Sequence, residues 1–471
     1  MSRSTVAAVV TEGLARSHVP RVFVAAGAPR SLTAAARARG LAVIETAGAT
    51  AACVMAAVTA ELIDAPGVAL VSLRQGLEPT VDGAAHATRD RAGVIVVSDG
   101  EGDARLLEPV VKASAVVNPA SAAHWIAHAA QAAMADPRGA VHLAIADAVA
   151  DAPAAPIATA VRPASPPPPT GDALDALAST IARAGRPVLV AGLETGLEDA
   201  KWIRALAESV PAPVLTTPKG KGALPDPHPL ALGSIAPGHA LFAQADLVVA
   251  IGVDDVELMP GIWPAGVPLA RITRAPHDDA VSGAIALIIE ELAPRLRGHT
   301  RADWDVAALD RLKRSLRPAS GGPGFARRRV VEIAREMTPA GTVLALDVPL
   351  ADAWASVNPR ECLVPNGVAT LGFALPAAIA GALAREAARV VAIGAAAGFD
   401  AMAAEWATAA RLGVPIVAIA LNHAGATDVA TAPGAAGVTI SGATDEAGFR
   451  VAFERAWHAA GPALVDTHVS R

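Results

Sequence analysis

Short apolar runs rich in β-branched residues recur along the whole chain, with alanine-rich stretches between them. Runs that are apolar on both faces are typical of buried strands, and the intervening stretches, about 10–20 residues each, can form crossover helices between parallel strands. The pattern therefore predicts an α/β fold of mainly parallel sheets covered by helices. The expected strands are Arg21–Ala25, Leu41–Ile44, Val68–Leu73, Gly93–Ser98, Ala140–Ile145, Pro187–Ala191, Ala212–Thr216, Leu247–Ile251, Leu269–Ile272, Thr342–Asp347, Arg389–Ile393, Pro415–Leu421 and Ala463–Thr467.

Two segments interrupt this rhythm and divide the chain into three parts. Arg162–Gly171 (RPASPPPPTG) is proline-rich and is expected to be extended, and Arg317–Gly324 (RPASGGPG) is expected to be flexible. A chain of 471 residues is long enough for two or three domains with full-sized cores. We predict three α/β domains, at residues 1–161, 172–316 and 325–471.

The charge balance argues against a nucleic-acid-binding protein. Lys and Arg total 39 against 45 Asp and Glu, whereas a nucleic-acid-binding face concentrates basic residues. No apolar stretch reaches the ~18–20 residues that span a bilayer, and the N-terminus lacks the features of a signal peptide, so we expect a cytoplasmic protein without a membrane partner. Cys53 and Cys362 are too few for a disulfide framework or a cysteine-based metal site.

Three stretches go beyond the fold class. The third part contains Thr370–Ile379 (TLGFALPAAI), Val390–Phe399 (VVAIGAAAGF) and Glu405–Pro415 (EWATAARLGVP), which resemble the diphosphate-binding domain of thiamine-diphosphate-dependent enzymes of the acetolactate synthase and benzoylformate decarboxylase group. Pro213–Leu230 (PVLTTPKGKGALPDPHPL) is similar to the central domain of that group, and Pro66–Ser98 resembles its pyrimidine-binding domain. The three resemblances follow the order of the family and cover nearly the whole chain.

The resemblance implies a fold, a chemistry and an assembly. Such enzymes cleave or form the bond next to a carbonyl carbon, typically in a 2-oxo acid, and thiamine diphosphate held by Mg²⁺ supplies the chemistry. The site lies between the first domain of one subunit and the third domain of another, which implies a homodimer or homotetramer acting on a small carbonyl compound. Whether the central domain holds FAD or another nucleotide stays open, because Gly192–Gly196 (GLETG) is not a G-x-G-x-x-G fingerprint.

The metal signature of the family is altered. Its Gly-Asp-Gly turn aligns with Ala395–Ala397, so Ala396 replaces the aspartate, and His423 replaces the second of two asparagines, of which Asn422 is kept. Mg²⁺ requires hard oxygen ligands, and an imidazole is a poor substitute. The resemblance thus leaves Leu371, Ala396, Ala397, Gly398 and Asn422 as cofactor-contacting candidates and leaves no conventional metal ligand set.

Two alignments are possible for the glutamate that activates the cofactor in the family. A gapless alignment back from Pro66 places Ala49 at its position, whereas Glu45, at the end of an expected strand, serves only if four residues are inserted after it. Both registers stay open at this point.

The region after Asn422 is a further departure. Only Ala424–Gly437 precedes Val438–Ile440, so about 30 residues of the family's active-site wall are expected to be missing. Arg74 and Glu78 flank Gly76, where the family has small residues near the cofactor.

The departures together argue against conventional catalysis with Mg²⁺ and thiamine diphosphate. The sequence predicts a divergent relative of the lyases and carboligases. The alternatives are a non-catalytic subunit that pairs with an intact homologue and a cofactor-independent enzyme using the vacated cleft. The catalytic candidates are Glu45, Arg74, Glu78 and His423.

Overall fold

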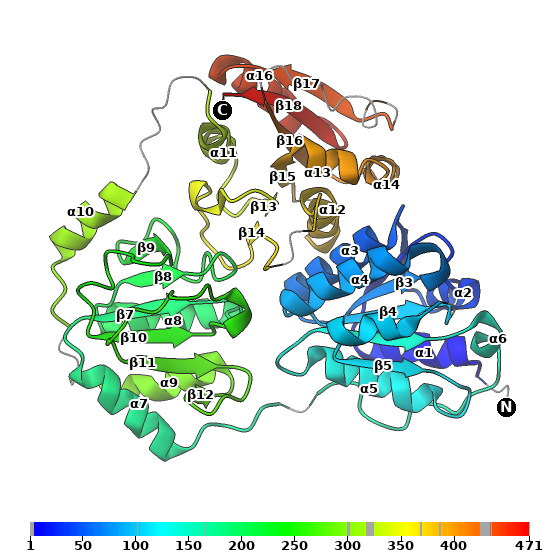
Figure 1. Ribbon diagram of the computed structural model, residues 1–471, viewed down its shortest axis with the longest axis horizontal. Helices are drawn as coiled ribbons and strands as arrows, with labels where there is room; N and C mark the ends of the chain where they lie inside the picture. Colours follow the sequence, from blue (N-terminus) through cyan, green and yellow to red (C-terminus); the bar gives the residue numbers. More distant parts are fainter. Residues whose placement is uncertain are drawn as a thin grey trace.

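Three six-stranded sheets, one after another along the chain, form the framework of the molecule (Figure 1). The computed structural model describes residues 4–100, 102–163, 165–298, 302–316, 325–367, 370–385, 388–423, 434 and 436–470. Every pairing between the named strands is parallel. The predicted α/β class and three-domain architecture are therefore confirmed, while the exact boundaries between domains stay predictions.

The first sheet has the order β2-β1-β3-β4-β6-β5 and is covered on both faces. Alternate residues of β3 point to opposite sides: Ala69 and Val71 pack with α3, and Val68 and Leu70 pack with α1 and α5. The elements are α1 (Val6–Arg16), β1 (Arg21–Val24), α2 (Arg30–Ala38), β2 (Ala42–Glu45), α3 (Ala49–Ile63), β3 (Gly67–Val71), α4 (Leu73–Arg89), β4 (Val94–Ser98), β5 (Ala113–Val116), α5 (Ala122–Met134), β6 (Ala140–Ala144) and α6 (Asp147–Ala150).

The second sheet has the order β12-β11-β10-β7-β8-β9. Helices α7, α8 and α9 cover one face, and α10 contributes Leu309 to the core on the other. The elements are α7 (Gly171–Arg183), β7 (Pro187–Ala191), α8 (Leu197–Ser209), β8 (Val214–Thr216), β9 (Ala231–Ser234), β10 (Leu247–Ile251), β11 (Leu269–Thr273), β12 (Ala280–Ser282), α9 (Ile285–Leu296) and α10 (Val306–Leu316).

The third sheet has the order β14-β13-β15-β16-β18-β17. Helices α11 and α16 pack on one face, and α12 and α14 on the other. The elements are α11 (Arg327–Glu336), β13 (Val343–Leu346), β14 (Cys362–Leu363), α12 (Ala374–Ala384), β15 (Val390–Ala395), α13 (Ala396–Ala401), α14 (Glu405–Leu412), β16 (Ile416–His423), β17 (Thr439–Ala443), α16 (Glu446–Trp457) and β18 (Ala463–Val469).

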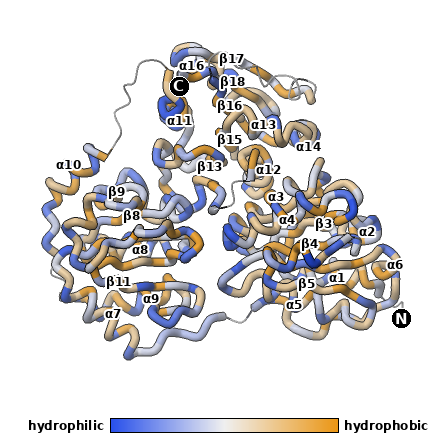
Figure 2. Tube along the Cα trace, viewed as in Figure 1, coloured by the Kyte–Doolittle hydropathy of each residue, from blue (hydrophilic) through white to orange (hydrophobic). Residues whose placement is uncertain are grey.

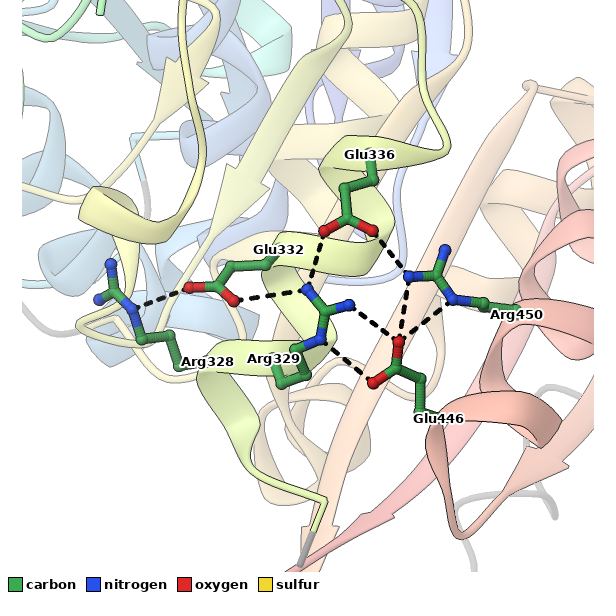
Figure 3. A network of polar contacts seen from close by, with 6 residues as sticks. All are labelled: Arg328, Arg329, Glu332, Glu336, Glu446 and Arg450. Carbon is green, nitrogen blue, oxygen red and sulfur yellow. Dashed lines mark hydrogen bonds and ion pairs between the residues drawn. The ribbon is translucent and has the colours of Figure 1, made fainter. Parts of the chain in front are cut away.

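A network of ion pairs ties α11 to α16 on the outer face of the third sheet (Figure 3). Arg329 reaches Glu336 and Glu446, each at 2.8 Å, and Arg450 contacts the same two carboxylates at 2.7 and 3.0 Å. These side chains are partly exposed, so each pair adds little stability alone. The network fixes the two helices against each other.

The first and third domains share one core. Helices α3 and α12 pack side by side (Figure 1), and a single hydrophobic cluster runs through both domains. Helix α12, whose trace is coloured mostly hydrophobic in Figure 2, consists of alanine, leucine, isoleucine, glycine and proline, and small side chains allow helices to approach closely. Within the described residues, no helix has the length and apolarity that a membrane crossing requires.

Candidate functional site

The carboxyl ends of β13, β15 and β16 meet at one edge of the third sheet. The register pairs Leu346 with Ile393 and Ala395 with Leu421, which brings Asp347, Ala396 and Asn422 to the same edge. In open parallel sheets, ligands bind at this edge. The turn at 395–398, predicted to be the altered metal turn, therefore lies at the expected place in the fold.

The described polar groups at this edge do not fit a Mg²⁺ site. Ala396, the first residue of α13, offers no oxygen ligand from its side chain. The Asn422 Oδ1 accepts a hydrogen bond from the backbone N–H of His423 at 3.0 Å. The His423 ring is exposed, and Arg327 Nη2 lies 2.9 Å from its Nε2. A guanidinium beside the imidazole disfavours a second cation there.

Asp347 is the functional candidate that sequence reasoning missed at this edge. It follows β13 directly, and its carboxylate lies so close to Gly394 and Gly398 that a Cβ on either glycine would approach within 2.5 and 2.9 Å of its oxygens. Burial raises the pKa of this carboxyl to about 6, although backbone N–H groups of Ala374 and Ala395 act in the opposite direction. One oxygen, Oδ1, is buried without a hydrogen-bond partner.

The donor set at this edge therefore does not fit a conventional Mg²⁺–diphosphate centre. A single carboxylate, an amide engaged with its neighbouring backbone and an imidazole paired with Arg327 fall short of the oxygen ligands that octahedral Mg²⁺ prefers. Across the part of the chain that the structure describes, no three His, Cys, Asp or Glu side chains gather in a way that could hold a metal ion.

In the first domain, the two candidates for the activating glutamate position have different environments. Glu45 ends β2, and its exposed side chain pairs with Arg37 of α2 at 2.8 Å. Ala49 opens α3, is buried, and lies 3.4 Å from where a Cβ on Gly76 would stand. The register of the glutamate stays a prediction.

Arg74 and Glu78 are exposed on α4, on either side of a break in the helix at Gly76. Leu371, expected beside the cofactor, is 61% exposed in the single chain. Of the segment Ala424–Gly437, nearly all lies outside the described residues. The structure thus places Glu45, Arg74 and Glu78 on the first domain and His423 against Arg327 of α11, and it does not bring the four catalytic candidates into one described cavity.

Glu405 of α14 joins the third domain to the turn between Glu45 and Ala49 in the first domain. Its buried Oε1 accepts hydrogen bonds from the backbone N–H groups of Ala47 and Gly48, at 2.8 and 3.2 Å. Burial raises the pKa of this carboxyl, opposed by hydrogen bonds from Thr408, Ala47 and Gly48. The contact holds the start of α3 in place.

We expect Glu405→Ala to lower the free energy of unfolding by about 2 kcal/mol, because two N–H groups at the domain contact lose their acceptor. Hydrogen exchange at Ala47 and Gly48 should accelerate. Glu454→Ala, at an exposed position of α16, is the control and should change neither quantity. Unaltered exchange at Ala47 and Gly48 in Glu405→Ala would show that the contact does not hold this turn.

A second feature is an interdomain cavity of about 490 Å³ between the first and central domains. Its walls come from the ends of α3 and β7, from the loop at 136–138, and from Arg274 after β11, with Arg360 of the third domain also contributing. None of the four catalytic candidates lines it.

All three domains meet next to this cavity, at Lys219. Its ammonium lies 2.7 Å from Asp90 and 3.0 Å from Glu61, both in the first domain. Asp90 in turn accepts a hydrogen bond from the backbone N–H of Asn366, in the third domain, at 2.7 Å. Lys221 pairs with Asp226, which accepts from the backbone N–H of Ser356 at 2.7 Å. The lysines of the central-domain signature thus take part in the contacts between domains.

Comparisons with known proteins agree with this architecture. Residues 174–278 match the family model of the thiamine pyrophosphate enzyme central domain, and residues 347–428 match that of the C-terminal TPP-binding domain. A protein from Mycobacterium smegmatis, described as a thiamin diphosphate-dependent enzyme, superposes with a TM-score of 0.83 over 99% of this chain and 100% of its own, at 19% identity.

The curated relatives are named as a decarboxylase and as acetolactate synthases. A protein named as a 2-ketoarginine decarboxylase from Pseudomonas aeruginosa is 33% identical over 45% of this chain and 41% of its own length. An acetolactate synthase from Mycobacterium bovis is 30% identical over 52% of this chain and 45% of its own. The catabolic acetolactate synthase of Raoultella terrigena is 26% identical over 78% and 74%. The chain thus spans less than half the length of the first two relatives.

Proposed function

The chain belongs to the thiamine-diphosphate-dependent enzyme superfamily, and from this premise we propose that it is a divergent member of the lyase and carboligase group that has abandoned conventional catalysis with Mg²⁺ and thiamine diphosphate. Its ancestral substrate is a 2-oxo acid or a related carbonyl compound. The named activities of the relatives, a decarboxylase and acetolactate synthases, support this substrate class.

One observation carries the proposal: the turn after β15 presents Ala396 where the chemistry needs a carboxylate. Without that ligand the diphosphate has no metal bridge to the protein, and no cationic side chain stands in the 395–398 turn to replace it. Asp347 does not compensate, because its carboxylate is packed against Gly394 and Gly398 and adds negative charge at the place where a diphosphate would bind.

A non-catalytic subunit that pairs with an intact homologue is the second candidate. A cofactor-independent enzyme would need its acid, base and anion-binding groups in one pocket, and none of Glu45, Arg74, Glu78 and His423 lines either described cavity. Affinity purification from the native host tests this candidate, and recovery of copies of this chain alone would count against it.

Calorimetric titration with thiamine diphosphate, with and without Mg²⁺, tests the main proposal. We expect no binding in either condition. The double variant Ala396→Asp/His423→Asn restores the oxygen ligands of the family signature and should gain Mg²⁺-dependent binding. Ala401→Asp adds the same charge at an exposed position of the same helix and should gain none. Wild-type binding that strengthens with Mg²⁺ would refute the proposal and restore a conventional decarboxylase or carboligase.

A further inference from the structure

The interdomain cavity contains one arginine that differs from the others. Three cavity arginines are already neutralised: Arg91 by Asp254 at 2.7 Å, Arg138 by Asp64 at 2.7 Å, and Arg274 by Asp199 at 2.6 Å. Within the described residues, the guanidinium of Arg360 has neither an ion pair nor a hydrogen bond. An arginine that lines a cavity without a partner is an anion receptor by its chemistry, since it presents up to five N–H donors in a planar fork.

The backbone of Arg360 also points to a role in the cavity. Its φ is +62°, a left-handed conformation that side-chain-bearing residues adopt at the expense of strain, and its carbonyl lies 3.5 Å from Arg385 Nη2. Burial lowers the pKa of its guanidinium, Glu61 and Asp64 oppose that change, and Arg138 and Arg274 reinforce it. The fold therefore keeps a strained, desolvated guanidinium that has no direct ion-pair or hydrogen-bond partner within the described residues.

Glu194, from the central domain, is an acidic side chain that lines the same cavity as Arg360. Its carboxylate accepts the backbone N–H of Arg274 at 2.7 Å, and no cationic side chain forms an ion pair with it within the described residues. Burial raises its pKa to about 7, with Asp254 and Asp136 adding to the increase and backbone N–H groups opposing it. Near neutral pH this group both donates and accepts hydrogen bonds.

Two backbone N–H groups at this edge of the sheet already donate to carboxylates of the protein itself. The N–H of Leu193, after β7, donates to Glu257 at 2.8 Å, and the N–H of Gly196, before α8, donates to Asp199 at 2.9 Å. Both lie where a phosphate would bind in a fold of this kind, and each brings a carboxylate there instead. Acidic side chains outnumber arginines on the cavity walls, eight to four, so a multiply charged phosphate would meet repulsion.

We propose that this cavity binds a small organic acid, whose single carboxylate pairs with Arg360 and whose polar far end hydrogen-bonds with Glu194. A volume of about 490 Å³ is sufficient for a ligand of this size. Because Arg360, Glu194 and Arg138 come from the third, central and first domains, the bound acid stabilises the arrangement of all three. This site is separate from the edge formed by Asp347, Ala396 and Asn422.

Thermal unfolding and calorimetry with four probes test the proposal: lactate, which has a carboxylate and a hydroxyl; acetate, which lacks the hydroxyl; inorganic phosphate; and AMP. Ionic strength is matched with sodium chloride, and the titrations cover dissociation constants up to about 10 mM. Lactate should raise the unfolding temperature and bind more tightly than the other three probes. Arg360→Gly should weaken lactate binding at least about tenfold.

Arg360→Gly also serves as its own folding control, because glycine adopts φ +62° without strain and the variant should unfold at the same temperature or a higher one. Arg204→Met, which removes an exposed arginine of α8, should bind lactate as the wild type does. Equal lactate binding by the wild type and Arg360→Gly, or no lactate binding at all, would overturn the proposal. Arg360-dependent binding of AMP or phosphate that is tighter than that of lactate would also overturn it and indicate a phosphate site.

Discussion

Lys219→Met should lower the free energy of unfolding by about 3–5 kcal/mol, because it leaves Asp90 and Glu61 as buried carboxylates without a cation. The Lys219 side chain is 3% exposed and Asp90 2%. Burial disfavours the ammonium, yet the attraction of Asp90 and Glu61 outweighs it and raises the pKa of Lys219 above its ordinary value. Urea denaturation of the full chain measures the effect.

Lys201→Met is the matched control for this experiment. Lys201 pairs with Glu198 on the surface of α8, where both side chains are largely exposed, so its loss should change the free energy of unfolding by less than about 0.5 kcal/mol. The triple variant Lys219→Met/Asp90→Asn/Glu61→Gln should recover part of the stability, because it removes the buried charges together. If Lys219→Met is as stable as Lys201→Met, the ion pairs of Lys219 with Asp90 and Glu61 do not stabilise the contact between the domains.

Raising the pH from 6 to 8.5 should destabilise the protein through Glu257 and Glu194. Burial raises the pKa of each carboxyl from 4.5 to about 7. An acid whose pKa is higher in the folded state contributes stability that is complete below its unfolded pKa and is lost as the pH rises through the folded pKa. The whole loss from Glu257 is on the order of 3 kcal/mol between pH 4.5 and 8.5, and on the order of 1 kcal/mol of it falls between pH 6 and 8.5. Its carboxyl lies among the N–H groups of Leu193 and Asp254 and the Thr217 hydroxyl.

Glu257→Gln should therefore flatten this pH dependence. The amide cannot ionise, so free energies of unfolding measured at pH 6 and pH 8.5 should differ less than they do in the wild type, with Glu194 responsible for the remaining difference. Glu198→Gln changes an exposed glutamate of the same domain and should leave the slope unaltered. Equal slopes in the wild type and Glu257→Gln would contradict the assignment.

The interior of each sheet could be predicted from sequence, whereas most of the edges could not. Continuous apolar runs identified strands such as β3, β10 and β16, which are buried on both faces. The strands β5, β9, β12, β14 and β17 were absent from the predicted strands, and each lies at the end of its sheet. An edge strand is paired on one side only and is often short, so it needs no long apolar run and leaves a weak pattern in the sequence.

The candidate site was predictable only where it depends on local spacing. The positions of Ala396, Asn422 and His423 at strand ends follow from counting along the chain. Asp347 and Arg360 were missed because their significance depends on what lies beside them: a glycine of β15 and a glycine of α13 for Asp347, and a cavity formed by two other domains for Arg360. No periodicity in a single sequence reports such long-range neighbours.

The pairing of α3 with α12 has a consequence for synthesis of the chain. About 320 residues separate the end of α3 from the end of α12, so at typical rates a ribosome takes roughly 16–64 s to deliver the second helix after the first. During that interval the alanine-rich flank of α3 has no partner, although the rest of its domain can already be folded. A nascent chain with such an exposed apolar face is expected to bind chaperones. On overexpression, the supply of chaperones should therefore limit the yield of soluble protein more than the stability of the folded chain does.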